Sequence, residues 1–100
     1  MRIEVLYVPG CPNYQPAVAL VQEVLASESL QADVHGVAVG SNVEAKVLRF
    51  PGSPTIRIDG DDVEPSHASS FGLSCRLYAD RSGVPSEEVL RLALRAKRKE

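Results

Sequence analysis

The first forty residues carry two strand-like runs separated by a helical pattern, and this succession limits the possible folds more than any other feature. Residues 2–8 form a short apolar run that Pro9-Gly10 stops, which is typical of a β-strand. Apolar residues then recur at helical spacing from about residue 13 to residue 28, and residues 32–39 indicate a second strand. Two strands joined by a helix in this way run parallel, with a right-handed crossover.

The middle of the chain predicts a short helix and then a hairpin. Ser41 or Asn42 can cap a helix over residues 43–49. The apolar face of that helix is expected to consist of Val43, Val47 and Leu48. Residues 55–58 alternate as a strand should, and Asp59-Gly60 is typical of a tight turn that leads into a return strand with Val63.

The end of the chain predicts a loop and a last helix. Residues 65–84 are rich in Ser, Gly and Pro, so we expect a loop with at most a single helical turn. Ser86 can cap a helix that ends in the basic run 95–99, which is expected to lie in solvent and suits the negative end of a helix dipole. The predicted order is therefore β-α-β-α-β-β-α. It fits one α/β domain over residues 1–100, with a four-stranded mixed sheet and helices on both faces.

Composition excludes several classes of function. A net charge of −2 gives no reason to expect nucleic acid or a membrane as partner. The chain has neither a signal-peptide pattern nor the ~18 consecutive apolar residues of a membrane span. Its two cysteines are too few for a secreted disulfide scaffold, so we expect a cytoplasmic protein with free thiols and no cofactor.

The predicted topology brings the two cysteines to the same end of the sheet. Cys11 lies at or just before the start of the first helix, where free N–H groups and the helix dipole favour a thiolate and are expected to lower the pKa of its thiol. Ser53-Pro54 opens the third strand at that end. The loop that contains Cys75 begins there too.

These segments carry a resemblance to a known family. A strand followed by Gly10-Cys11-Pro12-Asn13, and Gly52-Ser53-Pro54-Thr55 at a hairpin strand, resemble the thioredoxin superfamily over nearly the whole chain. With residues 72–78, the pattern is similar to short bacterial thioredoxin-like proteins, some of which are labelled alkylmercury lyase. The resemblance implies a cis Ser53-Pro54 bond and a site with Cys11 and Cys75 as catalytic residues. The substrate-binding residues that it implies are Gly10, Pro12, Asn13, Tyr14, Ser53, Pro54 and Thr55.

The chain departs from the family at one position of the motif. The family pattern Cys-x-x-Cys has a second cysteine where this chain has Tyr14, so the usual disulfide cannot form within the motif. Tyr14 is expected to shield Cys11.

Three hypotheses for the function remain open. Cys11 attacks a disulfide of a protein or a small thiol compound, with Cys75 as a candidate resolving thiol. Alternatively, the two sulfurs bind a soft metal or an organomercurial. In the third hypothesis the chain is a noncatalytic module that binds a partner beside Pro54, and is not an enzyme. His67 and the cysteines lack the spacing of a closed zinc site, so no resident metal is expected.

Overall fold

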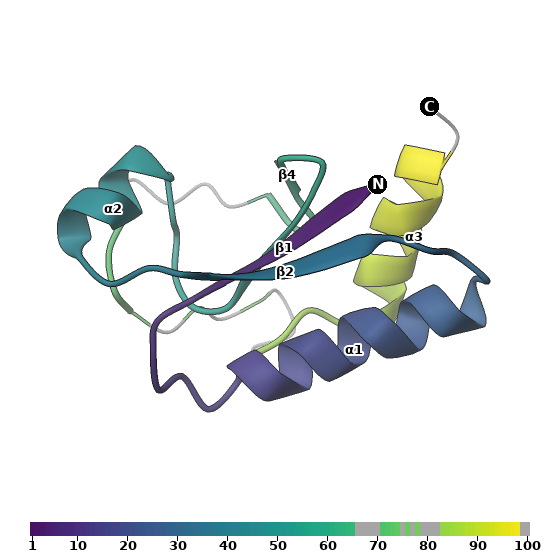
Figure 1. Ribbon diagram of the computed structural model, residues 1–100, viewed down its shortest axis with the longest axis horizontal. Coiled ribbons are helices and arrows are strands. Elements are labelled where there is room, and N and C mark those ends of the chain that lie inside the picture. Colours follow the sequence, from purple (N-terminus) through teal and green to yellow (C-terminus); the bar gives the residue numbers. More distant parts are fainter. Residues whose placement is uncertain (66–70, 75, 77, 79–82, 99–100) are drawn as a thin grey trace.

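A computed structural model describes residues 1–65, 71–74, 76, 78 and 83–98 of the chain. Within this part, three helices accompany a four-stranded mixed sheet, in the succession expected from the sequence (Figure 1). The elements are β1 (Arg2–Tyr7), α1 (Tyr14–Ser27), β2 (Asp33–Ala38), α2 (Asn42–Val47), β3 (Thr55–Ile58), β4 (Asp61–Asp62) and α3 (Glu87–Arg98).

The sheet has the strand order β2-β1-β3-β4. β1 and β2 are parallel, as the helical connection between them requires, with Arg2 opposite Asp33 at the start of their register. β3 is antiparallel to β1 and to β4. The turn between β3 and β4 has φ of 50° at Asp59 and 91° at Gly60, so the predicted tight turn with positive dihedrals is confirmed.

Side chains of the sheet alternate between two apolar cores. Ile3 and Val5 of β1 pack with α1 and α3, whereas Leu6 packs on the other face with Ala45 of α2 and with Phe50. The strand period of two therefore distributes the helices to both faces. In Figure 1, α1 runs below β1 and β2, and α2 lies on the opposite side at the upper left.

The start of α1 resolves the placement of its proline. The helix begins at Tyr14, so Pro16 is its third residue. N–H groups in the first turn of a helix have no acceptor within the helix, so the lack of an N–H group in proline costs no hydrogen bond here. The helix ends at Ser27. No helix in the described residues is long and apolar enough to cross a membrane.

The prediction for the apolar face of α2 was wrong for Val43 and Val47, whereas Leu48, at the end of the helix, is partly buried and packs against the core that contains Leu6 and Phe50. Val43 and Val47 are 71% and 76% exposed, and Ala45 is the residue of this helix that is buried against the sheet. The helix has only six residues, so a single small side chain provides its contact with the core. The predicted cap is confirmed, because the Ser41 hydroxyl accepts from the Glu44 amide at 3.2 Å.

At the basic end of α3, Arg95 and Arg98 are exposed, as expected, but this end also forms ion pairs that were not expected. The Arg95 guanidinium donates to both carboxylate oxygens of Glu28, at 2.6 and 3.2 Å, and the Arg91 guanidinium lies 3.6 Å from the same carboxylate. Lys97 pairs with Asp61 of β4. The cations of α3 thus tie this helix to the end of α1 and to the hairpin.

We predict that this cluster makes the free energy of unfolding decrease as the pH falls into the acid range. The hydrogen bond from Arg95 holds the pKa of Glu28 below its ordinary value of 4.5. A carboxyl group with a lowered folded-state pKa stabilises the protein above its unfolded pKa, and this contribution is lost as the pH falls through the folded pKa.

Glu28→Gln should therefore lower the melting temperature at neutral pH and flatten its dependence on pH below about 4.5. Circular dichroism melts over a pH series measure both effects. Glu23→Gln, an exposed position on the same helix, is the control and should leave the profile nearly unchanged. Parallel profiles for Glu28→Gln and the parent protein below pH 4.5 would show that the pair does not contribute.

Candidate functional site

Cys11 lies in the connection between β1 and α1. Gly10 has φ of 87°, a value that side chains disfavour, and it turns the chain so that the Cys11 amide donates to the Val8 carbonyl at 2.9 Å. The side chain of Cys11 is neither buried nor fully exposed. Because α1 begins at Tyr14, Cys11 precedes the helix by three residues and is not part of its first turn.

A cleft of about 200 Å³ lies beside Cys11. One wall is the segment 8–12, which contains Gly10, Cys11 and Pro12. The other wall consists of Ser53, Leu73 and Ser74. The structure therefore brings together two segments that are about forty positions apart in the sequence, as expected, and adds Leu73 and Ser74, which the sequence did not single out as site residues.

Ser53 holds the walls of this cleft in place through three hydrogen bonds. Its hydroxyl accepts from the Val8 amide at 3.0 Å. Its own amide donates to the Ser74 carbonyl at 2.7 Å, and its carbonyl accepts from the Arg76 amide at 2.9 Å. Ser53 is 1% exposed, so these bonds are shielded from water.

Pro54 and Thr55 are buried and are not among the residues that line the cleft. The Ser53-Pro54 peptide bond is cis, which confirms that prediction. The Pro54 carbonyl accepts from the Tyr78 hydroxyl at 2.7 Å, and the buried Thr55 hydroxyl donates to the Gly52 carbonyl at 2.6 Å. Both residues therefore fix the backbone that carries Ser53.

A buried arginine fastens the segment after the cleft to the hairpin. The Arg76 guanidinium lies 2.7 Å from the Asp62 carboxylate and 3.2 Å from the Thr55 hydroxyl, and it also donates to the Glu64 carbonyl. Its central carbon lies 4.3 Å from the centre of the Tyr78 ring. Burial raises the pKa of Tyr78, so its hydroxyl keeps the proton that it donates to Pro54.

Sequence reasoning missed the roles of Arg76, Asp62 and Tyr78. In the sequence Asp62 lies only two residues after the predicted Asp59-Gly60 turn, and residues 65–84 are predicted to be a loop. None of the described residues between 71 and 78 is helical, so the single helical turn considered there is not found in the described part.

Tyr14 and Asn13 are not among the residues that line the cleft. The Tyr14 ring stacks on Tyr7 with centroids 3.8 Å apart, and its hydroxyl lies against Gly36 of β2, where a Cβ atom would overlap it. The expectation that Tyr14 shields Cys11 is therefore not supported by its contacts. The Asn13 side chain lies against Gly83 and forms no cap bond to α1.

Cys75 and His67 lie outside the described residues, so the predicted pairing of Cys11 with Cys75 stays a prediction. Among the residues that the structure describes, no group of three or more His, Cys, Asp or Glu side chains could hold a metal ion. In comparisons with known proteins, no family model and no curated protein matches the chain.

The buried ion pair behind the cleft yields a stability prediction. Asp62→Asn should lower the free energy of unfolding by about 3 kcal/mol, because Arg76, whose side chain is 6% exposed, keeps its charge without a carboxylate partner. Asp61→Asn is a matched control in the same strand. Its carboxylate is 71% exposed, so we expect a loss of at most about 1 kcal/mol.

Urea unfolding of the two variants and the parent protein measures the difference. If Asp62→Asn and Asp61→Asn destabilise the fold equally, the pair between Asp62 and Arg76 does not anchor the segment in the way described here.

Proposed function

We propose that the chain is a thioredoxin-like thiol protein whose Cys11 carries out thiol–disulfide exchange with a protein or with a small thiol compound. The observation that supports it best is the shared cleft of Cys11 and Ser53. The resemblance to the thioredoxin superfamily pairs these two segments through their motifs, and the cleft gives them a common surface. The order of strands and helices is compatible with that arrangement.

The surroundings of Cys11 suit a thiol that reacts with a disulfide at the surface. A thiol used only as core filling is inert when buried in apolar surroundings, whereas Cys11 is partly exposed at the wall of a cleft. Val8, Pro9 and Leu73 line that cleft with apolar atoms, which can hold the carbon chain of a disulfide substrate. The exposed Ser74 supplies a polar side chain at the opposite wall, whereas the hydroxyl of the buried Ser53 already accepts from the Val8 amide.

The proposed step balances without a further reactant. The Cys11 thiolate attacks one sulfur of a substrate disulfide, a new S–S bond forms between Cys11 and that sulfur, and the original S–S bond breaks. The second substrate sulfur leaves as a thiolate and takes a proton from water. The product is a mixed disulfide on Cys11, and a second thiol is needed to release it.

The position of Tyr14 determines where that second thiol comes from. Tyr14 occupies the place of the second cysteine in the family motif, and its ring is packed on Tyr7. Release within the motif is therefore not available. We propose that the mixed disulfide lasts until Cys75 or an external thiol, in a reducing cytoplasm, resolves it.

Mild oxidation with oxidised glutathione tests this proposal. In the parent protein we expect both thiols to be lost through an internal disulfide. In Cys75→Ser we expect a glutathione adduct, or a dimer joined through Cys11. Intact-protein mass spectrometry and a count of free thiols distinguish these products, and Cys11→Ser is the control that should form no adduct at position 11.

The two parts of the proposal fail separately. If Cys11 in folded Cys75→Ser stays reduced under conditions in which the unfolded chain reacts, exchange at Cys11 is refuted, and a noncatalytic binding module becomes the better account. If the parent protein keeps two free thiols while Cys11 of the variant reacts, Cys75 is not the resolving thiol.

A further inference from the structure

The outer side of β2 has no neighbouring strand in the part of the chain that the structure describes. The amides of Asp33 and Val39 donate toward β1, to Met1 at 3.2 Å and to Tyr7 at 2.8 Å. Because the direction of the backbone groups alternates along a strand, Val34, Gly36 and Ala38 direct their N–H and C=O groups to the free edge. This edge thus offers three donors and three acceptors in a row.

β2 also lacks the features that usually protect a free edge. Its six residues, Asp-Val-His-Gly-Val-Ala, include no lysine, no proline and no charged residue other than the first. Natural edge strands are commonly blunted by lysine, proline, bulges or a covering segment, because unpaired strands recruit other strands. An unprotected edge of this length is suited to pairing.

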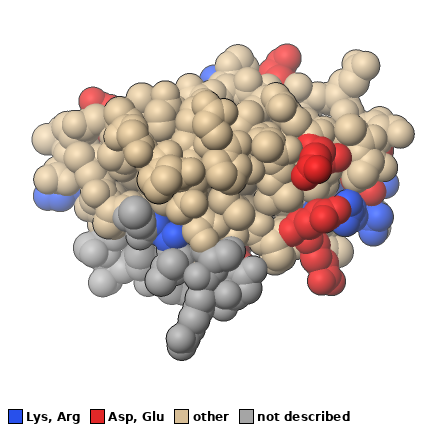
Figure 2. Space-filling model, turned by 90° about the horizontal axis from the view of Figure 1, so that it is seen from below, with Lys and Arg blue, Asp and Glu red and all other residues tan. Residues whose placement is uncertain are grey.

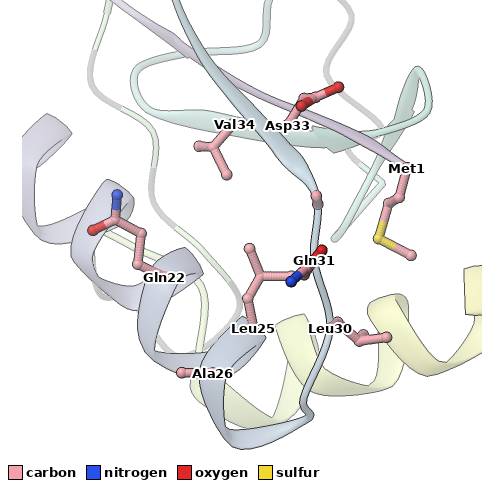
Figure 3. A pocket seen from close by; sticks show the side chains of 9 residues that line it. Met1, Gln22, Leu25, Ala26, Leu30, Gln31, Asp33 and Val34 are labelled. Carbon is pink, nitrogen blue, oxygen red and sulfur yellow. The ribbon is translucent and has the colours of Figure 1, made fainter.

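A groove of about 760 Å³ runs beside the edge, between the second half of α1 and the start of β2. In Figure 3, Leu25 of α1 and Val34 of β2 point toward each other across it, while the Asp33 carboxylate points to the other side of the strand. Gln22 and Ala26 form the helical side of the groove. Leu25 and Val34 thus contribute apolar atoms next to the free edge, and the helical side of the groove carries no charge.

The exposed side of α1 is nearly free of charge. Among the fourteen residues of this helix only Glu23 is charged, and the other exposed positions are Gln15, Pro16, Ala19, Gln22, Ala26 and Ser27. Figure 2 shows the molecule from the side on which α1 lies, with the charged side chains gathered mainly toward the ends of a broad uncharged area. In a two-fold contact the same surface of each copy faces the other, so a surface with many charges of one sign would repel its copy, whereas an uncharged surface does not.

We propose that two copies of the chain associate through β2, antiparallel, to form one continuous sheet. A two-fold axis at Gly36 pairs Gly36 with itself and Val34 with Ala38 of the other copy. This register uses all three outward-facing residues of each strand in hydrogen-bonded pairs, whereas an axis at His35 would pair only Val34 and Gly36 within the strands. It also sets His35 opposite Val37 and keeps the Asp33 carboxylates at opposite ends of the contact.

The spacing of the layers fits the same arrangement. Tyr14 of α1 lies over Gly36 of β2 and Tyr7 of β1, so the helix covers both strands. Two helices placed in this way on neighbouring copies would be about two strand spacings apart, or ~9.6 Å. Packed helices lie ~8–10 Å apart, so the uncharged sides of the two α1 helices would meet at contact distance.

Sedimentation velocity over a concentration series tests the association with the full chain. We expect the mass to rise from that of one chain, 10.8 kDa, to that of two. Ala38→Pro removes an outward-facing N–H that the single chain leaves in solvent, which an edge strand tolerates. Because symmetry removes the same hydrogen bond twice, the dissociation constant should rise about tenfold or more. Ala38→Val keeps the N–H and is the matched control, which should still form the dimer.

Amide hydrogen exchange identifies the edge without any substitution. The amides of Val34, Gly36 and Ala38 should become protected as the concentration rises, while those of His35 and Val37, which face β1, should be protected throughout. A chain that keeps the mass of one copy at the highest concentrations overturns the proposal. So does a dimer in which those three amides still exchange fast, or one that Ala38→Pro leaves as tight as the parent.

Discussion

Ser53 joins three parts of the chain that are far apart in the sequence, and the candidate site depends on it. Its hydroxyl accepts a hydrogen bond from the amide of Val8, just after β1. Its backbone forms hydrogen bonds with the backbone of Ser74 and Arg76 on the opposite side. All three hydrogen bonds are shielded from water. A polar group left without a partner in this buried position would lower the free energy of unfolding by about 1–3 kcal/mol. Ser53 is therefore the residue that connects the segment with Cys11 to the segment with Leu73 through hydrogen bonds.

A buried polar cluster around Arg76 holds the described residues of the segment after the cleft, 71–74, 76 and 78, against the hairpin. The described residues of that segment provide little apolar packing apart from Tyr78, and Arg76 compensates by bonding to the Asp62 carboxylate, the Thr55 hydroxyl and the Glu64 carbonyl. Such a cluster is costly when a member is missing, so it favours one arrangement over its alternatives. Ser53 and Arg76 thus act together, since one bonds to the backbone of the segment and the other fixes its side-chain contacts.

Local sequence signals predicted the features that depend on local chemistry. The Ser41 cap, the Asp59-Gly60 turn and the strands around residues 3–6 and 55–58 follow from the backbone preferences of a few neighbouring residues. The topology then followed from the parallel pair and the hairpin. For the site, the same reasoning predicted that Cys11 and Ser53 would lie at one end of the sheet, and they share a cleft.

Contacts between distant segments could not be predicted in this way. Val47 and Ala45 are both apolar, and which of them faces the core depends on how a six-residue helix lies on Leu6 and Phe50. The partner of Arg95 is Glu28, which is 67 positions away at the end of α1, and no local sequence pattern indicates the pair. Arg76 lies in a segment without regular structure. Its burial depends on the contact with Asp62 of β4, which the sequence around Arg76 does not indicate.

The most direct test of this account compares the reactivity of Cys11 in the folded and the unfolded chain. The rate of reaction of Cys75→Ser with a chromogenic aromatic disulfide would be measured in buffer and in denaturant at the same pH. If the cleft holds the disulfide beside the Cys11 sulfur, the folded protein reacts faster than the unfolded chain, because proximity replaces free encounter. If Cys11 is only a packing residue, the folded protein reacts more slowly, and the proposed exchange at this cleft is contradicted.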